Sequence, residues 1–429
     1  MGFVKKATLL GASEFVLACA GVISTVIYAR FLGPEGVGQY SVFMSTLTLV
    51  VPLASLGIGR ANIYFLNTQR YPRQEVIQNS MTFGVIVGVL LTVGMTAVFW
   101  TRDSFYGAFP WWCLVIFSFG MACHVVIALL RPVLVAALAS RKILSVDIIQ
   151  RVVLILGALA FALSGHLTVD WALVVTTSAG FAGMLLLLYF LRVELRHPFG
   201  WQMTWFRETA GYGIKIAASG ILFAITSSLT VLILADRLEH DFSVVGYYTR
   251  AVTISSFAVL IPRALSPLFY AKWSDAANKN KRDQIERAAR FNVAYGFLAA
   301  IGLIVLGRWV VVLLYGAEFI EAYSALVIFA PAMLVMCLFS IFNSVLASEG
   351  EAATTAGCLA LTLILVCALT YVLVPVYGMR GAAIAVLLGN ALSTVMLGVV
   401  CCRLYGLRLS QMLFLSPQDV RYVIAALKR

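Results

Sequence analysis

The sequence predicts an all-α polytopic membrane protein, with twelve transmembrane helices in two parallel six-helix lobes around a central cavity. Of its 429 residues, 62% are hydrophobic and only 12% are charged, which leaves too little polar side chain to cover a soluble globule. Apolar runs of about 20 residues, the length that crosses a bilayer, follow one another along the whole chain. The same pattern of residues also occurs near the start of each half.

Twelve apolar runs predict the transmembrane spans. The first begins after Lys5 and Lys6 and resembles a secretory signal, but it is too long and contains Glu14, so we interpret it as a helix that is retained. The predicted spans are 7–30, 39–59, 79–100, 111–139, 147–164, 171–191, 210–235, 246–269, 291–314, 322–347, 353–376 and 381–402.

The repeated pattern lies in residues 28–41 and 234–248. Each stretch reads apolar helix, charge, leucine, turn, glycine, aromatic residue and next helix, which indicates a duplication. An even number of spans returns the chain to its starting side, so the two lobes have the same orientation, like the parallel repeats of some transporters. The predicted parts are an N-terminal lobe (1–191), a cytoplasmic linker (192–209), a C-terminal lobe (210–404) and a cytoplasmic interfacial tail (405–429).

The basic residues predict the orientation. Most lysines and arginines fall in loops that lie on one side if the N-terminus is cytoplasmic, so both termini are expected there. The net charge of +12 then reflects this orientation and an affinity for anionic membrane lipids. Because the basic residues are spread over many short loops, nucleic acid is not expected as a partner.

Several kinds of chemistry have no support in the sequence. The eight cysteines lie mostly inside spans, with no C-x-x-C motif and no histidine cluster, so neither a metal site nor a disulfide framework is indicated. No G-x-x-x-x-G-K-[ST] motif for nucleotide binding occurs. The loops are too short for a catalytic domain, and we therefore expect neither an enzyme nor a cofactor.

Polar residues recur at helical spacing on corresponding spans of the two halves. Glu14, Gly21 and Thr25 share a face of the first helix, and Ser41 and Thr48 do so on the second. The seventh carries Lys215, Ser219, Thr226 and Thr230 in the same way. Since polar faces of membrane helices point at protein or water, these faces predict a hydrated central cavity.

Four motifs carry a resemblance to a known family, in register along nearly the whole chain. They are Arg30-Phe31-Leu32-Gly33-Pro34 with Gly38-Gln39-Tyr40, Val245-Gly246-Tyr247-Tyr248, Leu314-Tyr315-Gly316-Ala317-Glu318-Phe319 with Ala322, and the stretch Leu373 to Ala383. With them the chain resembles the polysaccharide flippases, for O-antigen and exopolysaccharide repeat units, of the multidrug, oligosaccharidyl-lipid and polysaccharide exporter superfamily.

The resemblance implies two lobes that form a V around a cavity opening alternately to either side. The implied cargo is an oligosaccharide on polyprenyl pyrophosphate, moved from the cytoplasmic to the outer leaflet of a bacterial cytoplasmic (inner) membrane for cell-surface polysaccharide synthesis. Other membrane proteins of polysaccharide assembly are further possible partners.

Three cations are candidates for binding the pyrophosphate. Lys215, Arg131 and Arg263 lie at similar shallow depths from the cytoplasmic ends of their spans, counting about 1.5 Å per residue. The alternative is that each extends to the interface or pairs with a helix carbonyl.

Six other candidates have proposed roles in coupling or gating. Glu14 either binds a coupling ion, H⁺ or Na⁺, or neutralises a cation, and His124 either accepts a proton or makes a buried hydrogen bond. The remaining set, near the outer face, forms an outer gate or anchors helices at the interface: Arg30, Asp236, Arg250 and Arg308.

Two other functions stay open. A cation-coupled multidrug exporter of the same superfamily needs acidic groups at mid-membrane, whereas the candidates here are mainly basic. A membrane polysaccharide polymerase or ligase needs a substantial outer loop, whereas residues 101–110 and 164–170 are short.

Overall fold

The computed structural model describes residues 3–99, 105–196, 200–239, 241–274, 280–406 and 412, with the side chains of 3–19, 107–108, 267–268 and 271 outside the description. Every regular element in these ranges is helical, which confirms the all-α class. The chain divides into two compact units, Met1–Leu232 and Ile233–Arg429. The predicted tail after residue 404 lies almost wholly outside the described residues, and the lobe boundaries stay a prediction.

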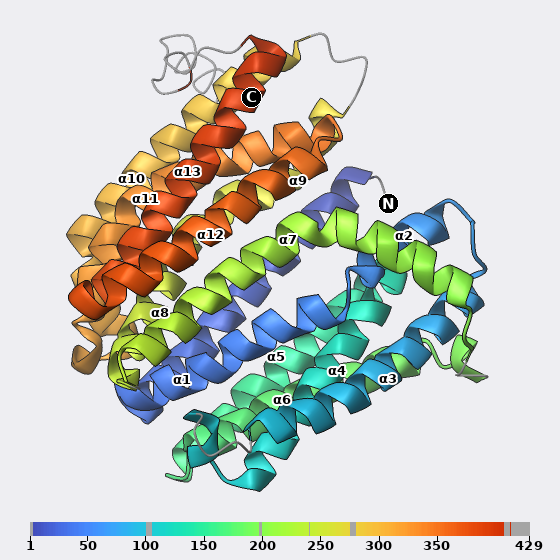
Figure 1. Cartoon of the computed structure of the whole chain (residues 1–429), viewed down its shortest axis with the longest axis horizontal. Helices are drawn as coiled ribbons and strands as arrows, with labels where there is room; N and C mark the ends of the chain where they lie inside the picture. The colour runs from blue at the N-terminus through green and yellow to red at the C-terminus, as the bar shows by residue number, and fades with distance from the viewer. Residues whose placement is uncertain are drawn as a thin grey trace. The chain divides into compact units, whose positions relative to one another are not determined.

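Unit 1 is a bundle built around α4 (Trp111–Ala136). Fifteen of the side chains of α4 are buried, because α1, α2, α3, α5 and α6 all pack against it (Figure 1). The surrounding helices are α1 (Phe3–Ala54), α2 (Ile58–Asn67), α3 (Arg73–Phe99), α5 (Ser140–Leu163), α6 (Val169–Phe190) and most of α7 (Met203–Arg237), with short 3₁₀ turns η1 (Phe105–Ala108) and η2 (Glu194–Arg196).

Unit 2 is built around α11 (Ala322–Ser348) in the same way. Helices on every side contact α11, and its own side chains are again largely buried. Its neighbours are α8 (Phe242–Ala258), α9 (Leu260–Trp273), α10 (Lys281–Tyr315), α12 (Ala352–Tyr377) and α13 (Met379–Tyr405), with η3 (Ala317–Phe319) after α10. Because α4 and α11 are both the fourth predicted span of their half, this arrangement agrees with the proposed duplication.

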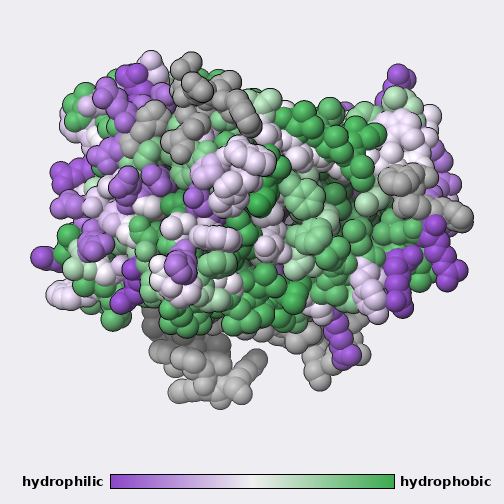
Figure 2. All heavy atoms as spheres, turned by 90° about the horizontal axis from the view of Figure 1, so that it is seen from below, coloured by the Kyte–Doolittle hydropathy of each residue, from purple (hydrophilic) through white to green (hydrophobic). Residues whose placement is uncertain are grey.

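The helices fit a polytopic membrane protein. Ten of them in the described residues are long and apolar enough to cross a membrane, and α8 with α9 passes the same test as one broken span bent by 52°. The break at Gly33, where φ is 66°, divides α1 into the first two predicted spans. The count of twelve is therefore approximately met. Figure 2 shows apolar side chains over much of one face. Large apolar side chains such as Leu90 and Leu298 are exposed in the structure.

Local chemistry accounts for the breaks that apolar runs do not show. After Pro52 the chain turns through Leu56 and Gly57, both with positive φ, into the short helix α2, which the sequence analysis did not predict. Between α8 and α9 the bend falls just before Pro262, whose ring nitrogen cannot donate the hydrogen bond that would continue the helix.

Candidate functional site

The segment that follows α6 is attached to α3 of unit 1. Glu194 forms an ion pair of 3.0 Å with Arg73 at the start of α3. Beyond the undescribed residues 197–199, the backbone N–H of Gly200 donates to Thr82 Oγ1 (3.2 Å), and that of Gln202 donates to Asn79 Oδ1 (2.7 Å). The described ends of the predicted linker are thus bound to α3.

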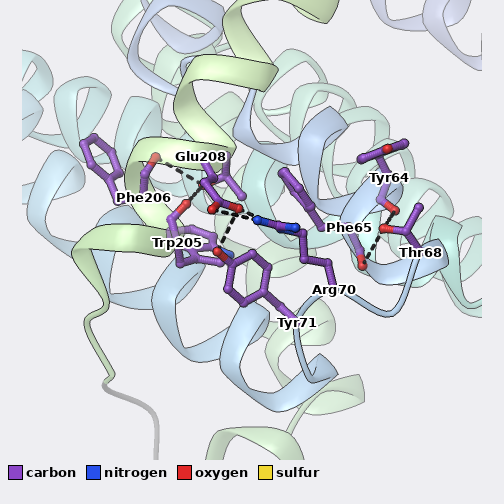
Figure 3. Close-up of polar contacts among 9 residues, drawn as sticks. Tyr64, Phe65, Thr68, Arg70, Tyr71, Trp205, Phe206 and Glu208 are labelled. Atoms are coloured by element: carbon purple, nitrogen blue, oxygen red, sulfur yellow. Dashed lines mark hydrogen bonds and ion pairs between the residues drawn. The ribbon is translucent and has the colours of Figure 1, made fainter.

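The start of α7 is held against the α2–α3 loop by one carboxylate. Figure 3 shows Arg70 and Tyr71 of the loop pointing at Glu208 of α7. Arg70 donates from Nε and Nη2 to the two carboxylate oxygens, at 2.8 and 2.9 Å, and the Tyr71 hydroxyl donates to Oε2 at 3.0 Å. These bonds raise the pKa of Arg70, and burial, with the bond to Glu208, raises that of Tyr71. The bonds from Arg70 and Tyr71 lower the pKa of Glu208, so Arg70 and Glu208 are both charged at neutral pH.

Two glycines allow α7 to cross the α1–α2 turn at van der Waals distance. A Cβ on Gly213 would lie 2.7 Å from the Gly57 carbonyl carbon, and one on Gly57 would lie 2.3 Å from the Gly213 carbonyl oxygen. Real Cβ contacts are not this short, so glycine is required on both sides. The crossing brings α2 alongside the first half of α7.

Beside this crossing, Arg60 of α2 extends over α7. Its Nη1 donates to the Ile216 carbonyl at 3.4 Å, and its guanidinium fills the space that a side chain at Gly220 would take, 3.0 Å from the Cβ position. Lys215, whose side chain is exposed, directly precedes Ile216 on α7. Within the described residues, neither cation has a carboxylate partner.

Arg151 is a third cation of unit 1 that has no carboxylate partner among the described residues. It lies eleven residues into α5, about 16 Å along the helix, and its Nη1 is 3.9 Å from the Cβ position of Gly21. Gly21 belongs to the small, polar face predicted on the first helix. The guanidinium therefore reaches that face, with no ion pair among the residues that the structure describes.

Arg131, by contrast, is engaged inside unit 1. Its Nε and Nη2 donate to the two oxygens of Asp147 on α5, at 3.1 and 2.6 Å. The Arg131 side chain is 35% exposed and that of Asp147 18%. A bidentate pair of this kind satisfies both charges and gives Arg131 a partner within the bundle, so its role in binding an anion stays a prediction.

His124 is a packed residue of α4. Its Nδ1 is 2.9 Å from the Gly120 carbonyl, and the ring lies against Gly180 of α6, where a Cβ would be 2.5 Å from Cε1. This geometry fits the buried hydrogen-bonding alternative, while a role in proton transfer stays a prediction. The side chain of Glu14 lies outside the described residues, so its pairing also stays a prediction.

The remaining candidates are dispersed. Arg263 is exposed on α9 of unit 2, and Arg30 is exposed on α1 of unit 1. Arg250 is only 5% exposed and lies 5.5 Å from the centre of the Tyr315 ring, in the interior of unit 2. Asp236 and Arg308 are exposed. The outer gate therefore stays a prediction.

Most hydroxyls of the predicted polar faces bond to their own helices. Ser41 donates to Val37 (2.7 Å) and Thr226 to Leu222 (2.8 Å), and Thr25, Thr48 and Thr230 do the same. Such bonds satisfy a hydroxyl without water. These faces alone thus do not require a hydrated cavity.

Sequence reasoning missed Arg60, Arg151 and Asp147 for one reason. Apolar windows place span ends at charged residues, so Arg60 falls just outside the second predicted span, and Asp147 and Arg151 fall at the very edge of the fifth, where charges are expected to meet water. In the structure α5 begins at Ser140, before Asp147, and Arg131 pairs with Asp147 within the bundle. The available signal was the spacing of Asp147 and Arg151, one helical turn apart and both continuous with the apolar run.

The fold is that of a known class of membrane transporters. An inward-facing multidrug resistance MATE family transporter of the MOP superfamily superposes with a TM-score of 0.75 at 14% identity. The superposition covers 90% of this chain and 94% of the transporter. The lipid II flippase MurJ, in an inward closed conformation, superposes over 95% and 89% with a TM-score of 0.73 at 13% identity. A MOP superfamily transporter from Pyrococcus furiosus superposes with a TM-score of 0.66 at 13% identity, over 94% of this chain and 95% of that transporter.

The sequence itself places the chain more narrowly. Residues 3–271 match the family described as polysaccharide biosynthesis protein, and the chain belongs to that family. A curated relative, the probable low-salt glycan biosynthesis flippase Agl15 of Haloferax volcanii, is 24% identical over 156 residues. That similarity covers 35% of this chain and 33% of the relative, so the chain matches about a third of its length. The predicted family is confirmed.

Proposed function

We propose that the chain is a flippase that moves a polyprenyl-pyrophosphate-linked oligosaccharide from the cytoplasmic to the outer leaflet, by alternating access between its two lobes. The observation that carries the proposal is the pair Arg60 and Lys215: Arg60 of α2 bonds to the α7 backbone at Ile216, the residue after Lys215, and both cations are exposed and have no carboxylate partner in the described part of the chain. A pyrophosphate is the dianionic or more highly charged group that two such donors would bind.

The proposal revises the cation set that the sequence suggested. Lys215 stays in it, Arg60 takes the place of Arg131, and Arg151 of α5, which reaches Gly21 on the first helix, is a further donor. Arg263 stays a candidate of unit 2. The names of MurJ and Agl15 support a flippase, and the MATE likeness supports the same transporter fold.

The cellular setting belongs to the same proposal. We place the chain in a cytoplasmic (inner) membrane with both termini on the cytoplasmic side, as a transporter without catalytic chemistry. Coupling to H⁺ or Na⁺, with Glu14 or His124 as the site, is part of the hypothesis, as is contact with other polysaccharide-assembly membrane proteins.

The test is delivery of a fluorescent polyprenyl-pyrophosphate oligosaccharide across the bilayer of proteoliposomes. The native chain is compared with Lys215→Ala, Arg60→Ala and the double variant at matched protein levels. We expect each single variant to lower the initial rate about tenfold, because a charged hydrogen bond to the phosphate contributes about 1.5–3 kcal/mol. Arg141→Ala, an exposed cation at the start of α5, is the matched control.

Each result is decisive for part of the proposal. Transport by the native chain that persists in the double variant keeps the flippase assignment and removes these two cations from the site. If the native chain moves no lipid-linked glycan but exports an organic cation, the multidrug exporter is the better assignment. An equal loss in Arg141→Ala would show a general effect of surface charge.

A further inference from the structure

Tyr64 and Tyr212 lie on the same strip of unit 1 as the two cations. Helix α2 and the first half of α7 run antiparallel, so residue numbers rise along one helix as they fall along the other. The ring centres of Tyr64 and Tyr212 are 4.6 Å apart, Arg60 reaches Ile216 one turn further, and Arg70 meets Glu208 at the other end. We call this antiparallel contact the α2–α7 seam.

The tyrosine pair is supported from inside and open outside. Phe65, only 5% exposed, packs beneath both rings, with centre distances of 5.4 Å to Tyr64 and 5.6 Å to Tyr212. Tyr64 nevertheless keeps 45% of its surface exposed. A large aromatic side chain that is fixed in place by a buried neighbour and stays half exposed is a preformed surface for a ligand with apolar C–H groups.

The register of the seam sets the tyrosines beside the phosphate donors. Tyr64 and Arg60 are four residues apart on α2, and Tyr212 and Lys215 three apart on α7, so each ring and its cation share a helix face. The rise along the helix between each tyrosine and its cation is about 4.5–6 Å. That offset matches the step from a phosphate to the sugar ring bonded to it through the anomeric oxygen.

An aromatic belt residue is the ordinary explanation for an exposed membrane tyrosine. Tyr189 fits it: the ring is 55% exposed near the end of α6, with Arg192 over it at 4.5 Å. The seam differs in two respects. Its two tyrosines come from different helices and pack against each other, and its cations lie on the adjacent turns of both helices without an acidic partner in the described residues.

We propose that Tyr64 and Tyr212 form a platform on which the sugar next to the pyrophosphate stacks, while Arg60 and Lys215 bind the phosphates. The inference rests on the proposed function and adds the head-group sugar as the feature that this site recognises. A pyranose presents C–H groups of partial positive charge on one face, and the face of an aromatic ring is negative. The platform thus selects glycan-loaded carrier over the bare carrier lipid.

The experiment compares two probes on purified protein in nanodiscs. One is a polyprenyl diphosphate that carries N-acetylglucosamine, and the other is the same polyprenyl diphosphate without sugar. Equilibrium binding of each radiolabelled probe is measured for the native chain, Tyr64→Ala, Tyr212→Ala, Tyr64→Phe and the control Tyr189→Ala.

The native chain should bind the sugar-bearing probe more tightly. Tyr64→Ala and Tyr212→Ala should weaken that binding about five- to tenfold and change the binding of the sugar-free probe less than about twofold. Tyr64→Phe keeps the ring and should bind as the native chain does, as should Tyr189→Ala. Unchanged sugar-free binding also reports that each variant is folded.

Three results would overturn the platform. Equal loss of both probes in the alanine variants would make the tyrosines mere supports of the seam. Native binding that ignores the sugar, or alanine variants that keep full preference for it, would remove recognition from this site while leaving the proposed function intact. If the native chain binds neither probe, the proposed function fails and the platform fails with it.

Discussion

At the scale of single residues, the partner of each cation determines what it can bind. In the sequence, Arg131 lies inside an apolar run and Arg60 directly follows one, and nothing there tells their partners apart. Arg131 meets Asp147 in a bidentate pair, whereas Arg60 meets a carbonyl oxygen and a glycine. A backbone carbonyl satisfies one donor of a guanidinium and leaves its charge available to an anion.

Removing Arg131 should therefore reduce stability more than phosphate binding. Arg131→Met leaves Asp147 without its counter-charge inside the bundle and should cost about 1–3 kcal/mol, less than for a fully buried pair. Arg131→Met with Asp147→Leu should recover most of the loss. Thermal unfolding in detergent measures the stability, and the sugar-free diphosphate probe measures binding. A folded Arg131→Met that loses the probe would return Arg131 to the site.

A second charge network predicts a pH dependence in unit 2. Glu349, between α11 and α12, accepts a hydrogen bond from the Tyr405 hydroxyl and forms an ion pair with Lys281 at 3.2 Å. The hydrogen bond from Tyr405, with the Lys281 pair adding to it, lowers the pKa of Glu349 below its ordinary value of 4.5 despite partial burial. A carboxyl with a lowered pKa stabilises the folded state above its unfolded pKa, and this contribution is lost as the pH falls through the folded value.

Glu349→Gln should accordingly lower the melting temperature by about 1–3 °C at pH 7, since partly exposed pairs contribute little. The difference from the native chain should shrink progressively as the pH falls below the ordinary glutamate value of 4.5. Scanning fluorimetry between pH 8 and 3.5 makes the measurement, and Glu318→Gln, exposed after α10, is the control. A difference that persists unchanged at low pH would assign the effect to lost packing.

At the scale of elements, the crossing of α7 over the α1–α2 turn depends on Gly57 and Gly213. Any side chain at Gly213 meets backbone atoms of the turn, which cannot move aside as a side chain can. Gly213→Ala should destabilise unit 1 by about 1–3 kcal/mol and weaken phosphate binding, because α7 is displaced from Arg60. Gly57→Ala adds the strain of a positive φ, 68°, and should be worse.

The matched control lies two residues away on the same helix. A Cβ at Gly211 meets no atom within 4 Å, so Gly211→Ala should be neutral or stabilising through the higher helix propensity of alanine. Melting temperatures of the three variants, with binding of the sugar-free probe, provide the comparison. Equal effects of Gly211→Ala and Gly213→Ala would mean that helix propensity and not the crossing decides the outcome.

The sequence predicted the helices far better than the contacts between them. Hydrophobic runs locate spans because the bilayer imposes one length, and the breaks at Gly33 and Pro34 were visible as turn residues. The helix α2 was not, since its ten residues merge into the polar stretch after the second span. Which cation meets Asp147 depends on the packing of α4 against α5, and one sequence holds no signal for that.

At the scale of the whole molecule, α8 and α9 decide the topology. If the bent pair crosses the membrane as one span, five crossings separate the α5–α6 turn from the α11–α12 turn, because α6, α7, α8 with α9, α10 and α11 lie between them. The two turns then lie on opposite sides. If the pair enters and leaves on one side, only four crossings remain and the turns share a side.

Single cysteines test this count. His166→Cys and Ala352→Cys place an exposed thiol in each turn, and a membrane-impermeant maleimide should label only His166→Cys in intact spheroplasts and both after permeabilisation. The described native cysteines are buried or half-buried, so their background should be low, and the unmutated chain measures it. Equal labelling of both variants before permeabilisation would contradict the twelve-span topology and the cytoplasmic termini.

The attachment of the interlobe segment to α3 matters for anyone who divides the gene into two co-expressed halves. A cut in the polar stretch near residue 198 looks natural, but it sends residues 200–232, which belong to unit 1, into the other polypeptide. That fragment would expose Trp205 and Thr209, both fully buried in the intact chain. Two autonomous polypeptides are better obtained by a cut after Arg237, where α7 ends.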